Sequence, residues 1–317
     1  MEERDFQELL KNKTGEVQKM ISEGLSGYLN GFGDCGYVRT VLEAMEYSFM
    51  AGGKRLRPLL MRETYLLFAG RKEKTPEELR DFMTALEMIH TYSLVHDDLP
   101  AMDNDEYRRG KKTTWKVYGD AMAVLAGDAL MNGAFEIAFR AILGGVTNGL
   151  SAAEQSRLAR SGAMLAGKAG IDGMLGGQVA DVEAEKKHLP MDADKILFIH
   201  EKKTAALIET AMGIGAILAG ASGEQLEAIL DVARKVGIAF QIQDDLLDVI
   251  GDSAVLGKTV GSDAESGKET YVTLKGVEAS GEDVKRLSEE AVKTLETLPG
   301  DSEFLKALIL HLIYRNK

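Results

Sequence analysis

The stretch FQIQDDLLD, residues 240–248, decides the fold class, because it embeds three carboxylates in an otherwise apolar segment with helical periodicity. On a helix, positions 241, 244, 245 and 248 share one face, so Gln241 and the aspartates Asp244, Asp245 and Asp248 are expected to point the same way. Unpaired carboxylates in an apolar setting are costly, and a bound divalent cation is the simplest compensation. The stretch therefore predicts a metal-binding wall built on a helix.

A second aspartate cluster, DDLPAMD at residues 97–103, occurs much earlier in the chain. It follows a periodic apolar segment through Phe82, Leu86 and Ile89, and Pro100 must interrupt that helix because it cannot donate to the backbone ladder. Carboxylate ligands without His or Cys select Mg²⁺ or a related ion such as Mn²⁺, which usually also contacts substrate phosphates. One cluster alone could be a solvated acidic face. Two clusters, together with basic segments suited to phosphate, predict a diphosphate–metal site.

The rest of the chain also favours helices. Its 317 residues include only 5 prolines and 6% aromatics, and no alternating strand pattern with hairpin turns is visible. Capping boxes at residues 151–154 and 222–225, and Pro76 in an expected first turn, mark helix starts. The segments expected to connect helices are residues 144–151, 186–192, 251–268 and 298–302. None of them reads as a domain linker, so residues 1–317 are expected to form a single all-α domain.

Charge and hydropathy exclude several classes of partner. A net charge of −12 and a pI near 5.1 argue against nucleic acid or an anionic membrane surface. The N-terminus lacks an apolar signal core, and the longest apolar run, residues 211–221, is shorter than the roughly 20 residues that a spanning helix needs. A cytoplasmic protein without an integral membrane segment is therefore expected. The lone Cys35 cannot form an intrachain disulfide.

Two basic segments stand out against this acidic background. They are KRLR at residues 54–57 and RRGKK at residues 108–112. Gly52 and Gly53 directly precede the first segment and would allow close approach to a ligand. Lys54 and Arg57 are therefore expected to bind phosphate, whereas Lys111 and Lys112 are expected to be ordinary surface residues.

In order and spacing, these elements resemble the trans-isoprenyl diphosphate synthases over nearly the whole chain, and within that family its bacterial farnesyl type. The segments that carry the resemblance are residues 52–58, 97–103 with 108–110, 176–178, 203–204, 240–248, 257–258 and 267–271. Val272 departs from the pattern, since a proline commonly follows the tyrosine, and this leaves a local turn in doubt. The resemblance implies a bundle of long helices around a deep central cavity, several Mg²⁺ ions per site and a homodimer.

The resemblance also implies a reaction and a role for each site residue. The reaction is the head-to-tail (1'-4) condensation of isopentenyl diphosphate with dimethylallyl or geranyl diphosphate to give (E,E)-farnesyl diphosphate. The principal metal ligands implied are Asp97, Asp103 and Asp244, supported by Asp98, Asp245 and Asp248. The residues implied to act on the allylic diphosphate are Arg108, Lys203, Thr204, Gln241, Lys258 and Lys268. Those implied to hold isopentenyl diphosphate are Lys54, Arg57, His90 and Arg109, although His90 by itself would be interpreted as a core histidine.

Product length is expected to depend on Tyr92 and Ser93, which precede the first aspartate cluster. Tyr92 lies about 7.5 Å before Asp97 at the usual helical rise. In related enzymes a bulky aromatic there acts as a floor, which favours a fifteen-carbon product, although a tyrosine at helical spacing is also ordinary core. A geranylgeranyl or geranyl diphosphate synthase is the alternative, and a non-catalytic helical metal-binding protein is a remote one. A terpene cyclase is disfavoured because such enzymes typically lack a segment like Lys54–Arg57.

Overall fold

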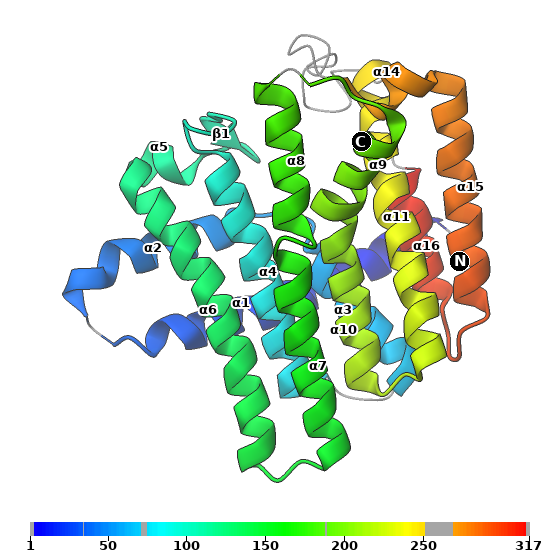
Figure 1. Cartoon of the computed structure of the whole chain (residues 1–317). Helices are drawn as coiled ribbons and strands as arrows, with labels where there is room; N and C mark the ends of the chain where they lie inside the picture. Colours follow the sequence, from blue (N-terminus) through cyan, green and yellow to red (C-terminus); the bar gives the residue numbers. More distant parts are fainter. Residues whose placement is uncertain (1–2, 34, 71–74, 188, 251–268, 315–317) are drawn as a thin grey trace. The chain divides into compact units, whose positions relative to one another are not determined.

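The computed structural model of the chain describes residues 3–33, 35–70, 75–187, 189–250 and 269–314. Helices dominate these residues, which confirms the predicted all-α class (Figure 1). The helical elements are α1 (Glu3–Asn30), η1 (Gly36–Val38), α2 (Arg39–Phe49), α3 (Leu56–Ala69), α4 (Glu77–Asp97), α5 (Thr114–Tyr118), α6 (Asp120–Thr147), α7 (Ala152–Ala169), α8 (Met174–Lys186), α9 (Ala193–Ile199), η2 (His200–Ala205), α10 (Ala206–Ala219), α11 (Gly223–Ile250), α14 (Tyr271–Lys275), α15 (Val277–Glu296) and α16 (Glu303–Ile313).

The chain divides into two compact units, each assembled from separate segments. Unit 1 consists of Met1–Phe6, Thr64–Arg71 and Gly167–Lys317, and unit 2 consists of Gln7–Glu63 and Lys72–Ala166. The first aspartate cluster belongs to unit 2 and the second to unit 1. The expectation of a single domain over residues 1–317 stays a prediction.

In unit 2, α4 and α6 pack against each other along their lengths. The apolar periodicity that predicts α4 is the buried face of that helix, because Phe82, Leu86 and Ile89 are fully buried. Gly127 of α6 lies against the ring of His96 near the end of α4, where a Cβ atom would collide with that ring. Close packing at this point holds the carboxyl end of α4, and with it the start of the first aspartate cluster.

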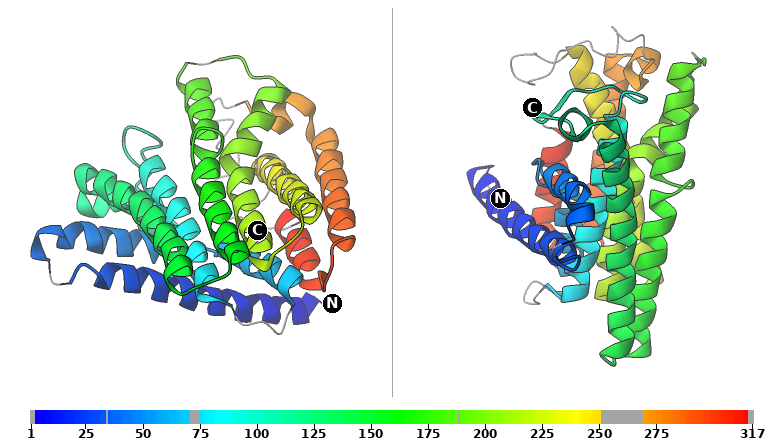
Figure 2. Two further views of the ribbon diagram at one scale, coloured as in Figure 1. Left: turned by 60° about the horizontal axis from the view of Figure 1, so that its bottom comes forward. Right: turned by 90° about the vertical axis from the view of Figure 1, so that its left-hand side faces the viewer.

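In unit 1, α11 packs between α10 and α15, and Figure 2 shows α11 beside α15 from a second direction. α10 is buried over almost its whole length, which explains its continuous apolar sequence. α11 buries the apolar side chains Ile229, Val232 and Val236, which recur at helical spacing along it. The second aspartate cluster lies near the carboxyl end of this supported helix.

The predicted helix starts are largely confirmed. Ser151 and Glu154 exchange both bonds of a capping box, and Ser222 and Gln225 do the same. Pro76 is the residue immediately before α4. The predicted connection at residues 144–151 is too long, because α6 continues to Thr147; Gly145 stays helical where it packs against a leucine of α7.

One short hairpin, which no alternating pattern in the sequence indicates, lies at residues 107–112 of the described chain. There β1 (Tyr107–Arg108) pairs antiparallel with β2 (Lys111–Lys112). The two central residues of the turn, Arg109 and Gly110, have φ of 53° and 76°, as a type I′ turn requires. Strands of two residues are too short to produce a visible alternation in a sequence, which is why the pattern did not indicate them.

Among the described helices, α6 is long and apolar enough to cross a membrane by length and composition, with a mean hydropathy of 1.3 over its most apolar window. Of that window, 44% is buried inside the protein. Buried helices in the core of soluble proteins can be equally long and apolar, so the length and hydropathy of α6 alone are weak support for a membrane span.

Candidate functional site

The first aspartate cluster is shaped by a turn that folds back on the end of α4. The backbone N–H of Asp103 donates to the carbonyl oxygen of Asp97 at 2.9 Å, and the N–H groups of Met102 and Asn104 both donate to Leu99. Asn104 adopts φ 57°, a conformation that asparagine tolerates better than most residues. The turn brings the first and last aspartates of the cluster together, with Asp97 partly exposed and Asp103 exposed.

Asp98 has a different environment from its two neighbours. It is 4% exposed and accepts a 2.6 Å hydrogen bond from Nε of Arg108, the residue that begins the turn of the hairpin. Burial raises the pKa of Asp98 to about 6, although Arg108 acts in the opposite direction. The ion pair therefore ties the hairpin to the end of α4.

Arg109, on the same turn, contacts the glycines that precede the first basic segment. Its Nη1 donates to the carbonyl oxygen of Gly52, and its guanidinium group occupies the space that a Cβ atom on Gly53 would need. Gly52 and Gly53 have φ of 99° and 128°, where side chains other than glycine are strained. In this structure Arg109 occupies the space beside these glycines, and it joins the two basic segments into one basic cluster. The close approach of a ligand at Gly52 and Gly53 stays a prediction.

Arg55 does not share the exposure of its neighbours. It is 4% exposed and forms an ion pair with Glu87 at 2.7 Å, and it also donates to Gln18 and to the carbonyl oxygen of Phe49. A charge so deeply buried is stable only with such partners. Arg55 thus stabilises the protein interior next to the basic segment and is not available to a ligand. Lys54, its neighbour in the chain, is exposed.

Arg57 is the residue of this segment that best fits an anionic ligand. Its Nε is buried and has no hydrogen-bond partner among the described residues. Burial and the neighbouring Arg109 lower the pKa of Arg57 to about 10, which still leaves it charged at neutral pH. His90 lies in the same electrostatic environment, because burial and then Arg57 and Arg109 depress the pKa of His90 well below its usual range. The histidine is therefore neutral, with one ring nitrogen that can donate a hydrogen bond and one that can accept.

Tyr92 and Ser93, the predicted product-length residues, lie on α4 just before the first cluster. Tyr92 is 7% exposed and meets the ring of His96 edge-to-face at 5.8 Å, while Ser93 is partly exposed and donates to the carbonyl oxygen of His90. Burial, and then the charge of Asp97, raise the pKa of Tyr92. The tyrosine is thus a neutral, packed side chain.

In unit 1, Lys203 and Thr204 lie on the π-helical segment η2. Such segments are rare and frequently occur at functional sites. Gly177 of α8 packs directly against the backbone of Lys203, where a Cβ atom would collide with the amide nitrogen. Gly177 therefore has a physical role, since it lets α8 approach η2. Nζ of Lys203 also pairs with Asp181 at 2.6 Å.

A chain of hydrogen bonds connects η2 to the second aspartate cluster. Thr204 donates to Gln241 at 3.0 Å, and Nε2 of Gln241 donates to Asp245 at 3.4 Å. Asp245 is 6% exposed, whereas Asp244 and Asp248 are partly exposed on the same helix. The three aspartates that share a helical face therefore differ in their access to a ligand.

Not every predicted residue can be placed. Lys258 and Lys268 lie outside the described residues. In the described part of the chain, no group of three or more His, Cys, Asp or Glu side chains converges on one point that could hold a metal ion. Val272, which left a local turn in doubt, is buried in the first turn of α14, where Thr270 and Thr273 form a capping box.

Several residues that organise the site are absent from the sequence prediction. Glu87 could have been noticed, because a carboxylate flanked by buried apolar residues of α4 needs a cationic partner. Asp181 and His200 gave no comparable signal, since their partners lie more than 20 positions away along the chain. Tyr271 belongs to the segment 267–271 that carries the resemblance, but its contact with Asp245 was not predicted.

Helical units that carry carboxylate clusters together with arginines and lysines have the chemistry to bind a polyanion and divalent cations. This combination is characteristic of enzymes that act on diphosphates. The sequence model of the polyprenyl synthetase family matches residues 38–303, and the chain belongs to this family.

Individual relatives give the same result. The chain is 43% identical to farnesyl diphosphate synthase of Escherichia coli K12 over 281 residues, which cover 87% of this chain and 90% of that protein. Among solved structures, an FPP/GFPP synthase from Zymomonas mobilis is 34% identical, with a TM-score of 0.82 over 96% of this chain and 98% of that one. A geranylgeranyl pyrophosphate synthetase from Pyrococcus horikoshii is 29% identical, with a TM-score of 0.84 over 98% and 99%.

Proposed function

We propose that this enzyme joins isopentenyl diphosphate to dimethylallyl and then geranyl diphosphate and releases (E,E)-farnesyl diphosphate. The observation that carries the proposal is the arrangement in unit 2, where a basic cluster containing the unpartnered Nε of Arg57 is tied to the first aspartate cluster by the Arg108–Asp98 ion pair. Family membership supports it, because polyprenyl synthetases use a divalent metal ion and act on these two classes of diphosphate.

The aspartates that remain accessible are the proposed metal ligands: Asp97 and Asp103 in unit 2, with Asp244 and Asp248 in unit 1. Hard carboxylate oxygens fit Mg²⁺, and Mn²⁺ as a substitute. Bound metal ions would neutralise the charge that develops on the diphosphate as it leaves the allylic carbon.

Basic and polar residues of the chain are proposed to bind and orient the two substrates. Lys54, Arg57 and Arg109 would hold the diphosphate of isopentenyl diphosphate, with neutral His90 as a hydrogen-bonding partner. Arg108, Lys203, Thr204 and Gln241 would orient the allylic substrate, and Lys258 and Lys268 are proposed to add positive charge there. The diphosphate is proposed to leave the allylic carbon first, which gives an allylic cation. The isopentenyl double bond then attacks this cation, and the released diphosphate takes the departing proton.

The product length is proposed to be fifteen carbons because Tyr92 is a packed aromatic side chain shortly before Asp97. The relatives include enzymes that make other lengths, such as the FPP/GFPP and geranylgeranyl synthases described above. A geranylgeranyl diphosphate synthase is therefore the second candidate function. Incubation with Mg²⁺, labelled isopentenyl diphosphate and each allylic diphosphate tests both: a main C15 product supports the proposal, a C20 product supports the alternative, and no condensation contradicts both.

A cytoplasmic homodimer is also proposed. In support, the described side chains of α6 include an exposed apolar stripe with Leu125, Phe139, Leu143 and Val146, and Phe139 alone is 68% exposed. Light scattering after size-exclusion chromatography should give about twice the chain mass. Phe139→Glu combined with Leu143→Glu should give monomers, and a monomeric unsubstituted protein would contradict the proposal.

A further inference from the structure

Asp245 stands apart from the other aspartates of the second cluster because protein groups surround its carboxylate. Its Oδ1 accepts from Nε2 of Gln241, and its Oδ2 accepts from the backbone N–H of Tyr271 at 3.2 Å and lies 3.5 Å from Nε2 of His200. These three groups come from α11 itself, α14 and η2. The carboxylate of Asp245 therefore contacts α11, which carries Asp244, and also η2, which carries Lys203 and Thr204. It contacts α14 as well.

The bond from Tyr271 has a structural cause. Tyr271 is the first residue of α14, and the first N–H groups of a helix have no partner inside it. Asp245 supplies the acceptor for the N–H group of Tyr271. The carboxylate is thus needed to satisfy a buried amide, which leaves it poorly suited to exchange that contact for a metal ion.

Tyr271 is held at its other end by α15. Its phenol donates to Asp283 at 2.8 Å, and its ring is 4% exposed. Burial and this bond raise the pKa of Tyr271 to about 12, so the phenol keeps its proton as a donor. Asp283 in turn is fixed by Arg286 at 2.8 Å.

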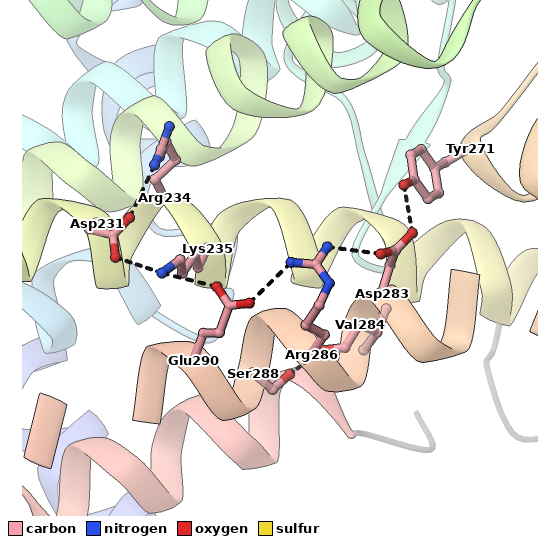
Figure 3. A network of polar contacts seen from close by, with 9 residues as sticks. All are labelled: Asp231, Arg234, Lys235, Tyr271, Asp283, Val284, Arg286, Ser288 and Glu290. Carbon is pink, nitrogen blue, oxygen red and sulfur yellow. Dashed lines mark hydrogen bonds and ion pairs between the residues drawn. The ribbon is translucent and has the colours of Figure 1, made fainter. Parts of the chain in front are cut away.

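The contacts continue from Arg286 along α15 and return to α11. Arg286 pairs with Glu290, Glu290 pairs with Lys235 of α11 at 3.2 Å, and Lys235 pairs with Asp231 at 2.7 Å (Figure 3). α11 and α15 are thus connected twice, by this chain of ion pairs and through Tyr271. The Tyr271 connection lies at the carboxyl end of α11, within one residue of Asp244.

We propose that Asp245 is a positioning residue and not a metal ligand, and that Tyr271 and Asp283 anchor it so that Asp244 and Gln241 are held in place. This inference rests on the proposed function in taking Asp244 as a metal ligand. Its structural part concerns the protein without substrate or metal, so it can be tested separately.

The first test is hydrogen exchange of the metal-free protein. Tyr271→Phe removes the phenol donor and keeps the ring and the backbone N–H, and Asp283→Asn weakens the same contact. Each is expected to speed exchange at residues 244–250 at least about threefold, and the double variant should equal either single one, because both remove one interaction. Asp231→Asn is the matched control, since it removes a carboxylate from the far end of the same network, and it should leave exchange at 244–250 unchanged.

The second test separates positioning from ligation. In calorimetric titrations with Mg²⁺ and inorganic diphosphate, Asp244→Asn should abolish binding without changing the exchange of the Tyr271 amide. Asp245→Asn should speed that exchange and weaken binding about tenfold or less. Tyr271→Phe should lower kcat several-fold with the KM for isopentenyl diphosphate unchanged.

The proposal is overturned if exchange at 244–250 is the same in Tyr271→Phe, Asp283→Asn and the unsubstituted protein. It is also overturned if Asp245→Asn abolishes metal binding as completely as Asp244→Asn while the Tyr271 amide stays protected. Failure of the unsubstituted protein to condense any allylic diphosphate would count against the proposed function alone, because the exchange measurements need no substrate.

Discussion

The N–H of Asp103 donates to the carbonyl oxygen of Asp97 at 2.9 Å, so a backbone hydrogen bond joins the first and last residues of the first aspartate cluster. The bond closes the turn that follows the end of α4 at Asp97 and contains Pro100. Because the contact is made by the main chain, substitution of either side chain should change the ligand set without unfolding the turn.

We therefore expect Asp97→Asn and Asp103→Asn each to lower kcat/KM by about a hundred- to a thousandfold, or ~3–4 kcal/mol in the activation barrier. The melting temperature should change little. Steady-state kinetics with geranyl diphosphate would measure the loss. Asp105→Asn is the control, because its exposed carboxylate makes a 3.4 Å contact with Arg108, whereas the bonds from Thr113 and Trp115 go to its backbone carbonyl and survive the substitution. Similar losses in all three variants would argue against a specific role for Asp97 and Asp103.

Substitutions of Arg55 and Arg57 should have different effects, the first on stability and the second on substrate binding. Arg55→Met leaves Glu87 without its buried partner, and breaking such a pair typically costs about 3–5 kcal/mol of unfolding free energy. Arg57→Met should be far less destabilising, because Nε of Arg57 is unpartnered in the described chain, and it should raise the KM for isopentenyl diphosphate. Urea unfolding and kinetics on both variants would check this, and equal destabilisation would contradict it.

Gly177→Ala should lower both stability and activity, because it disturbs the packing of α8 against η2. The added methyl group meets the backbone of Lys203, which cannot move aside as a flexible side chain would. Overpacking of this kind typically costs about 1–3 kcal/mol, and the displaced η2 should lower kcat as well. Gly167→Ala is the control, since that position of α7 has open space around it. Unfolding curves and kcat for the two variants give the comparison, and an unaffected Gly177→Ala enzyme would exclude this role.

Asp81 should make stability depend on pH. Burial, and then Glu77 and Glu78, raise the pKa of Asp81 to about 6. The folded state therefore binds a proton that the unfolded state releases near pH 4, and the stability gained from protonation is lost as pH rises through roughly 4 to 6. Asp81→Asn should stabilise the protein at pH 7 by up to about 1 kcal/mol, after allowance for partial exposure, and by almost nothing at pH 4.

Urea unfolding between pH 4 and pH 8 would measure this difference. Glu227→Gln, at an exposed position of α11, is the control and should show no such trend. A stabilisation by Asp81→Asn that grows towards low pH would have the opposite sign to the expected one.

Tyr92→Ala should lengthen the product. Removing a packed aromatic ring shortly before Asp97 opens space for further isoprene units, so C20 and longer products should increase at the expense of C15. Chromatography of the dephosphorylated products would detect the shift. Ser93→Ala removes only a hydroxyl group bonded to the backbone and should change the distribution much less. An unchanged distribution in Tyr92→Ala would remove Tyr92 from this role.

Much of the secondary structure could be predicted, because its determinants are local. The capping boxes at Ser151 and Ser222 bond as predicted, and α4 ends at the aspartate cluster ahead of Pro100. The hairpin at residues 107–112 and the continuation of α6 to Thr147 could not be predicted in the same way. Both depend on contacts with distant residues, such as the ion pair between Arg108 and Asp98.

The sequence by itself determined that the chain is helical, that it carries two aspartate clusters, and that basic residues gather near positions 54–57 and 108–112, because periodicity, caps and composition are properties of neighbouring residues. Only the tertiary structure decided which charges are used internally. Arg55, Asp98 and Asp245 are buried against Glu87, Arg108 and the Tyr271 amide, whereas Arg57, Asp97 and Asp244 keep access to solvent. Adjacent residues of like chemistry differ in this way because a charge can be buried only where folding brings it a partner from elsewhere in the chain.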